Sequence, residues 1–130
     1  MTALIQPQWL ADHLRDADVR IIEASVEKGT YAAAHIPGAV WLDCHRELLL
    51  HGDDSSGHVI PPEQFAALMS RLGVAPETTV VWYGDRHSSL AIRGFWTMDY
   101  YRHRGAVHVI EGGRERWIAE GRATTAELPH

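Results

Sequence analysis

Short apolar runs alternate with amphipathic stretches along most of the chain, and this alternation constrains the fold more than any other feature. The runs at 19–24, 39–42, 78–83 and 107–110 are rich in the β-branched and aromatic residues that favour strands. They are largely apolar from end to end, which is typical of strands buried on both faces. Strands separated by helices predict a parallel sheet with helices on both faces, so we expect the α/β fold class.

The stretches between these runs carry the signals of helices. The segment that opens at 61–62 has an apolar stripe with the spacing i, i+3, i+4 and i+7, and Gly73 is expected to end this helix. A longer helix is expected over about 88–104, ended by Gly105. Its apolar residues go most of the way around, which indicates burial on more than one side. Further helices are expected at 7–15, 30–35 and 114–120.

Length and composition indicate one ordinary globular domain. The chain has 130 residues, of which 45% are hydrophobic and 22% charged. We expect a domain over 1–122 and, over 123–130, a tail or the start of an interdomain linker. The formal net charge of −5 offers no electrostatic reason to bind nucleic acid or an anionic membrane. No apolar stretch approaches the roughly 20 residues of a membrane span, and the N-terminus lacks the pattern of a signal peptide.

The metal-binding residue types show no pattern that predicts a metal site or a cofactor. The chain has nine histidines, but their spacing matches no compact ligand motif. Asp53 and Asp54 lack the surrounding frame of a calcium-binding loop. The single cysteine, Cys44, cannot form an internal disulfide, and it fits a reducing compartment such as the cytoplasm.

Three segments together resemble the signatures of the rhodanese family: His35-Ile36-Pro37-Gly38-Ala39, the strand Thr79-Val80-Val81-Trp82-Tyr83, and Glu111-Gly112-Gly113-Arg114-Glu115-Arg116-Trp117. In addition, Glu23-Ala24-Ser25 and Tyr83-Gly84-Asp85 resemble the N-terminal half of two-domain bacterial sulfurtransferases. The resemblance implies transfer of sulfur from thiosulfate or 3-mercaptopyruvate to a thiophilic acceptor such as cyanide. It also implies that the C-terminal half carries the nucleophile and that the N-terminal half packs against it.

The resemblance places the sulfur-carrying cysteine directly after the strand, where this chain has Gly84. Sulfur transfer of this kind needs a thiolate at a strand–loop–helix turn, stabilised by backbone N–H groups and the helix N-terminus. Glycine has no side chain to carry sulfur, and the charge of Asp85 opposes an anionic donor, offset only in part by Arg86. We therefore expect no catalytic residue here and a degenerate active loop, formed by Gly84, Asp85, Arg86, His87, Ser88 and Ser89.

Two substitutes for the missing nucleophile were weighed. Cys44 follows the strand at 39–42, at the end of the sheet where such folds bind their ligands. A lone cysteine is more often a small buried hydrophobe, so Cys44 is expected to be inert. Ser88 and Ser89, with His87 as a base, lack the Gly-x-Ser-x-Gly turn of serine hydrolases, and helix capping explains them better.

The helix after this loop has more apolar surface than one face of a sheet can cover. Its aromatic residues predict a partly exposed patch that docks a second rhodanese domain, encoded by the same gene or supplied by a second copy. The candidate interface residues are Phe95, Trp96, Tyr100 and Tyr101. We expect a non-catalytic domain that shapes the cleft of a catalytic partner. The alternatives are a stand-alone binding module and a weak sulfurtransferase that uses Cys44.

Overall fold

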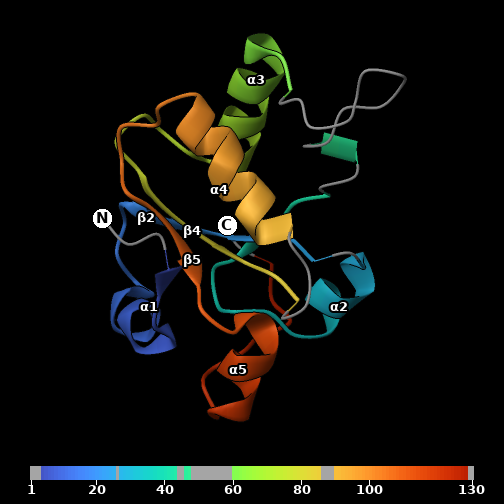
Figure 1. The fold of residues 1–130 in the computed structure, drawn as a ribbon. Coiled ribbons are helices and arrows are strands. Elements are labelled where there is room, and N and C mark those ends of the chain that lie inside the picture. The colour runs from blue at the N-terminus through green and yellow to red at the C-terminus, as the bar shows by residue number, and fades with distance from the viewer. Residues whose placement is uncertain (1–3, 26, 44–45, 48–59, 86–89, 129–130) are drawn as a thin grey trace.

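A computed structural model describes residues 4–25, 27–43, 46–47, 60–85 and 90–128 of the chain. Within this part, five strands form one sheet in the order β1-β5-β4-β2-β3, and every neighbouring pair is parallel (Figure 1). The expected α/β fold is thus confirmed. The strands are β1 (Leu4–Ile5), β2 (Val19–Glu23), β3 (Val40–Trp41), β4 (Thr79–Tyr83) and β5 (Val107–Ile110).

Helices cover both faces of this sheet. In Figure 1, α3 and α4 lie on one side of the strands, and α1, α2 and α5 lie on the other. No helix in the described part of the chain combines the length and apolar character that a membrane crossing requires. The helices are α1 (Pro7–His13), α2 (Lys28–Ala33), α3 (Pro62–Leu72), α4 (Leu90–Tyr100) and α5 (Gly113–Ala119).

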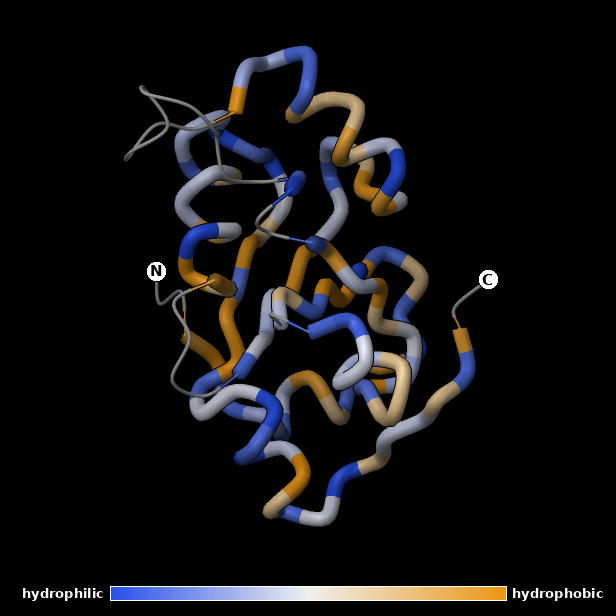
Figure 2. The backbone as a smooth tube through the Cα atoms, turned by 90° about the vertical axis from the view of Figure 1, so that its right-hand side faces the viewer, coloured by the Kyte–Doolittle hydropathy of each residue, from blue (hydrophilic) through white to orange (hydrophobic). Residues whose placement is uncertain are grey.

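The central strands are apolar throughout because successive side chains serve two separate cores. Ile22 and Trp82 pack in the cluster that contains the inner residues of α3 and α4. Their neighbours Ile21 and Val81 pack in the cluster formed with α1, α2 and α5. Figure 2 shows the hydrophobic stretches running through the middle of the molecule. Period-two alternation in a doubly covered sheet therefore needs apolar residues at both phases.

Two helix ends test the sequence-based boundaries. The predicted end of α3 is confirmed, because Gly73 adopts the left-handed conformation (φ 78°) that caps a helix. The predicted end of α4 is wrong, because the helix stops at Tyr100 and Arg102 takes the left-handed conformation (φ 55°) instead of Gly105. Gly105 is needed for another reason: a Cβ atom there would lie 2.0 Å from the carbonyl oxygen of Thr78.

The segment after α5 runs back across the domain. Thr125 and His35 form an antiparallel bridge in which each backbone N–H donates to the other's carbonyl, at 2.8 and 2.9 Å. The indole N–H of Trp117 donates to the carbonyl of Ala123 at 2.7 Å. A ring nitrogen of His35 also lies 2.8 Å from the carbonyl oxygen of Glu127. Residues 123–127 are thus held against the domain, whereas the division at residue 122 stays a prediction.

Candidate functional site

The candidate site lies at the carboxyl ends of β2, β4 and β5, the edge where parallel sheets bind their ligands. β4 is the middle strand of the sheet, so Gly84, which follows it directly, lies at the centre of this edge. Gly84 and Asp85 are buried and half-buried, respectively. Arg86 to Ser89 of the predicted loop lie outside the described residues, and so does Cys44.

The backbone around Gly84 leaves no room for a side chain. A Cβ atom at Gly84 would lie 2.8 Å from the carbonyl oxygen of Ala24 and 3.4 Å from its carbon. The two strands are fastened at this point, because the backbone N–H of Ala24 donates to the Tyr83 carbonyl at 2.8 Å. From the other side, the backbone N–H of Arg114 donates to the Gly84 carbonyl at 2.8 Å. Any larger residue at position 84 therefore requires a shift of the backbone.

A buried carboxylate, that of Glu23, lies next to this position. The parallel register places Glu23 opposite Tyr83, and the Tyr83 hydroxyl donates to one Glu23 carboxylate oxygen at 2.5 Å. The Ser25 hydroxyl donates to the other oxygen at 2.5 Å. Burial, followed by the negative charge of Glu23, raises the pKa of the Tyr83 phenol. The phenol is thereby held in its protonated, donating form.

Arg114 supplies the positive charge for this carboxylate. Its guanidinium, only 8% exposed, forms an ion pair with Glu23 and donates to the Ala34 carbonyl at 2.7 Å. A second carboxylate, that of Asp85, lies 3.8 Å from Arg114 Nε. Arg114 therefore connects α5 to β2, to the segment after α2 and to the start of the degenerate loop.

The turn before α5 determines where Arg114 points. Gly112 and Gly113 both have positive φ angles, 84° and 62°, which β-carbon-bearing residues rarely adopt. A Cβ atom at Gly112 would also lie 2.5 Å from the side chain of Arg116. The Gly-Gly pair thus turns the chain sharply from β5 into α5 and directs Arg114 back toward the sheet edge.

The Glu23–Arg114 pair was not predicted as part of the site, although both residues lie in quoted motifs. Two signals were available in the sequence: an acidic residue ending an otherwise apolar strand, and an arginine directly after Gly-Gly. Neither signal tells which residues meet, because that depends on the register between β2, β4 and α5. A buried carboxylate implies a buried cation, and Arg114 is the one that the fold delivers.

A hollow of about 220 Å³ opens beside Gly84, between the start of α4 and the Gly-Gly turn. Its apolar wall includes Leu4 and Ile92, and its charged lining residues, Asp85 and Glu111, are both acidic. Glu111 is itself paired with Arg116 at 3.1 Å. The described lining contains no thiol and no excess of positive charge, so it offers neither a sulfur acceptor nor an attractive field for an anionic donor.

A larger hollow, of about 610 Å³, lies along β3 at the edge of the sheet. Lys28 lies over the ring of Trp41, with 5.8 Å between the ammonium nitrogen and the ring centroid. Arg71 is paired with Glu47 at 2.5 Å, so much of the positive charge around this hollow is already balanced. Among the described residues, no group of three or more His, Cys, Asp or Glu side chains is placed to hold a metal ion.

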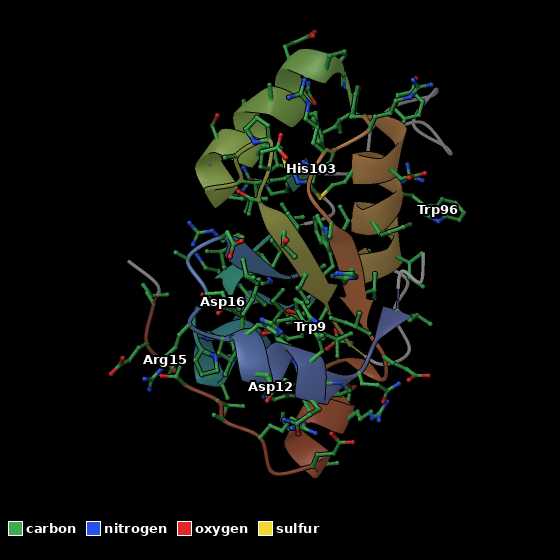
Figure 3. The ribbon with its side chains drawn as sticks, turned by 90° about the vertical axis from the view of Figure 1, so that its left-hand side faces the viewer. Trp9, Asp12, Arg15, Asp16, Trp96 and His103 are labelled. Carbon is green, nitrogen blue, oxygen red and sulfur yellow. The ribbon has the colours of Figure 1, made fainter. Side chains whose placement is uncertain are left out.

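The structure divides the four predicted interface residues into two pairs. Trp96 and Tyr100 are 62% and 65% exposed, and Figure 3 shows Trp96 pointing away from the body of the domain. Phe95 packs against the core instead. Tyr101 is half-buried, and its hydroxyl donates to the carbonyl of Ile60 at 2.5 Å. Only the first pair is available to a partner.

The chain matches the family model described as "Rhodanese-like domain" over residues 6–120. It is 39% identical over 126 residues to the sulfur carrier protein TtuD of Thermus thermophilus, covering 97% of this chain and 43% of that protein. It is 37% identical over 126 residues to the putative thiosulfate sulfurtransferase SseA of Mycobacterium tuberculosis, covering 97% of this chain and 41% of that protein. The chain thus spans about two-fifths of the length of the curated relatives that it matches.

Among solved structures, the chain is similar to SseA from Escherichia coli, which is described in connection with the rhodanese fold and 3-mercaptopyruvate sulfotransferases. The TM-score is 0.82 at 25% sequence identity, and the match covers 98% of this chain and 52% of that one. The agreement extends over nearly all of the chain and again leaves about half of the other protein unmatched.

Proposed function

The chain belongs to the rhodanese family, and from this premise we propose that it is a non-catalytic rhodanese domain of a sulfurtransferase. In this role it packs against a catalytic domain that carries the sulfur-accepting cysteine and forms one wall of that domain's cleft. The sulfur donor is thiosulfate or 3-mercaptopyruvate, and the acceptor is a thiophile such as cyanide. The proposed domain covers 1–122, and the polypeptide works in a reducing compartment such as the cytoplasm.

The packing of Gly84 is the observation that carries this proposal. The family resemblance places the nucleophile at position 84, and a Cβ atom there would lie 2.8 Å from the Ala24 carbonyl oxygen. The loss of the cysteine is therefore matched by the backbone around it. A domain whose loop has closed onto its neighbouring strand has no use for a thiolate at that position.

The charges around the loop support the same proposal. Thiosulfate and 3-mercaptopyruvate are anions, and a loop that accepts sulfur from them needs donors and positive potential. In the described part of the hollow beside Gly84, the charged lining residues are Asp85 and Glu111. The nearby cation, Arg114, is engaged by Glu23 and the Ala34 carbonyl. This edge therefore suits a wall beside an active site better than a sulfur-binding loop.

The lengths of the relatives support the presence of a partner domain. More than half of TtuD and of the mycobacterial SseA lies outside the match. A catalytic domain in that remainder would supply the cysteine that position 84 lacks. By the family resemblance, this chain corresponds to the N-terminal half of such a protein.

The test is the intact mass of the purified chain before and after incubation with thiosulfate, followed by cyanide. A working thiolate would attack the outer sulfur of thiosulfate, release sulfite and keep one sulfur atom as a persulfide, which cyanide would remove as thiocyanate. The proposal expects no change in mass. A gain of one sulfur atom that cyanide reverses, and that disappears in Cys44→Ser, would refute it.

A weak sulfur carrier that uses Cys44 is the second candidate, because the relative TtuD is described as a sulfur carrier protein. The same mass measurement separates the two candidates, since Cys44 is the single cysteine of the chain. A stand-alone binding module remains the third candidate. It predicts an unchanged mass together with a complete polypeptide that contains no second rhodanese domain.

A further inference from the structure

Large apolar side chains follow the outer side of α4 and the neighbouring edge strand. We call them the outer band, which consists of Leu4, Ile92, Trp96 and Tyr100, exposed by 48%, 46%, 62% and 65%. The three helical members are spaced at i, i+4 and i+8, so they share one side of α4. Contiguous exposed groups of this kind, with aromatic residues at their centre, mark surfaces that another protein covers.

The rotation of α4 is fixed by its inner side, so the outer band cannot turn into the core. Gly94 packs directly on Trp82, and a Cβ atom at Gly94 would lie 2.4 Å from the Trp82 ring. Thr97 and Met98, on the same side, are buried, and the Trp82 indole N–H donates to the Met98 sulfur at 3.2 Å. Trp96 therefore points outward because the opposite side of the helix is held close to the sheet (Figure 3).

The outer band continues into the candidate site. Leu4 and Ile92 line the hollow beside Gly84, together with Asp85 and Glu111. A partner that covers the band thus also closes over the degenerate loop. The acidic end of this surface favours a basic group on the partner, because complementary charges orient two surfaces as they meet. A loop that binds an anionic sulfur donor is basic for the same electrostatic reason.

We infer that the outer band is the docking surface for a second rhodanese domain of the same polypeptide, whose sulfur-binding loop lies against Asp85. This inference rests on the proposed function and adds the place and orientation of the partner. Its occupant follows from the relatives, in which more than half of the length lies outside the match. A standard interface involves about 20–30 residues on each side, so the band is its apolar centre and the degenerate loop is part of its rim.

The first experiment is hydroxyl-radical footprinting of the complete polypeptide that contains this chain, with Trp96 oxidation read by peptide mass spectrometry. Rates are compared with those of the same peptides in the unfolded protein. We expect Trp96 to be protected roughly fivefold or more, as for a side chain at the centre of an interface. Ile118, 50% exposed on α5 at the other face of the sheet, is the internal control and should stay reactive.

The second experiment compares two matched variants of the complete polypeptide. Ile92→Glu places a charge in the outer band, and Ile118→Glu places the same charge at a similarly exposed residue on α5. We expect Ile92→Glu to restore Trp96 oxidation and to lower the rate of sulfur transfer from thiosulfate to cyanide by about tenfold or more, since a buried unpaired charge separates the domains. Ile118→Glu should leave both readouts unchanged.

Three outcomes would overturn the inference: a Trp96 as reactive as Ile118, equal effects of the two variants, or protection of Trp96 that arises from a homodimer of a polypeptide without a second domain. The last outcome is recognised from the molar mass in solution. Failure of the proposed function has a different signature, since sulfur uptake by Cys44 changes the intact mass whether or not Trp96 is protected.

Discussion

Glu23 and Trp96 are both in surroundings that oppose their chemistry, one a charge that is 0% exposed and the other an indole ring that is 62% exposed. They lie on opposite sides of the same loop. The chain satisfies the first residue completely, through Tyr83, Ser25 and Arg114. It leaves the second uncovered. The buried network therefore belongs to folding, and the outer band belongs to association.

The two regions should respond to substitution in opposite ways. Removing one partner of a buried ion pair leaves a charge in a medium of low dielectric constant, which destabilises the folded state strongly. Removing an exposed apolar side chain changes little in the isolated domain. Four substitutions, ordered from the largest expected effect on the free energy of unfolding to the smallest, test this contrast.

Arg114→Met should have the largest effect. It leaves the Glu23 carboxylate buried without its cation, at a cost of about 3–5 kcal/mol in the free energy of unfolding. Urea unfolding followed by circular dichroism measures this. The matched control is Arg104→Met, because Arg104 is 77% exposed and lies 3.6 Å from an exposed Glu77; such pairs contribute about 0–1 kcal/mol. Equal effects of the two substitutions would show that the network does not stabilise the fold.

Gly84→Ala should destabilise the domain by about 1–3 kcal/mol, because the added methyl group overlaps the Ala24 carbonyl oxygen and forces a backbone shift. The control is Gly29→Ala in α2, where a Cβ atom would meet nothing within 4 Å. That substitution should stabilise the domain by roughly 0.5–1 kcal/mol, since alanine is the better helix former. Thermal unfolding shifts of opposite sign are expected, and a tolerated alanine at position 84 would weaken the proposed function.

Tyr83→Phe should cost about 1–2 kcal/mol, because the Glu23 carboxylate loses a hydrogen-bond donor and the Ile36 backbone N–H loses its acceptor. The substitution should also change the response to alkaline pH. Because the pKa of Tyr83 is raised in the folded state, its contribution is fully present below the unfolded value of 10.0 and is lost as the pH rises above it.

The wild-type chain should therefore lose stability more steeply above about pH 10 than Tyr83→Phe does. Unfolding in urea at a series of alkaline pH values measures the two slopes. Tyr100→Phe removes an exposed phenol and serves as the control for the loss of one tyrosine. Parallel slopes for the wild type and Tyr83→Phe would contradict the role assigned to the buried hydroxyl.

Trp96→Ala should have the smallest effect, within about 0.5 kcal/mol for the isolated chain, because the ring is largely in water already. Trp82→Ala, at a fully buried tryptophan of β4, should cost about 3–5 kcal/mol. The two values come from the same unfolding experiment. A large loss for Trp96→Ala would mean that the outer band contributes to the fold itself and is not reserved for a partner.

Much of the fold was predictable because its signals are local. The apolar runs indicated β2 to β5, and Gly73 correctly marked the end of α3. β1 was missed, because two residues paired with Val109 and Ile110 are too short to show a pattern. The end of α4 was misplaced, because Gly105 also carries the signal of a helix end although a close contact with Thr78 is what requires it there.

The candidate site was predictable only in part, for the same reason. The sequence alone determined the fold class, the family signatures and the absence of a side chain at Gly84. The tertiary structure decided that no side chain fits there, that Arg114 balances Glu23, and that Trp96 faces water while Phe95 faces the core. Periodicity and turn residues act over a few positions along the chain, whereas these contacts depend on strand register and helix rotation, which only the packed sheet establishes.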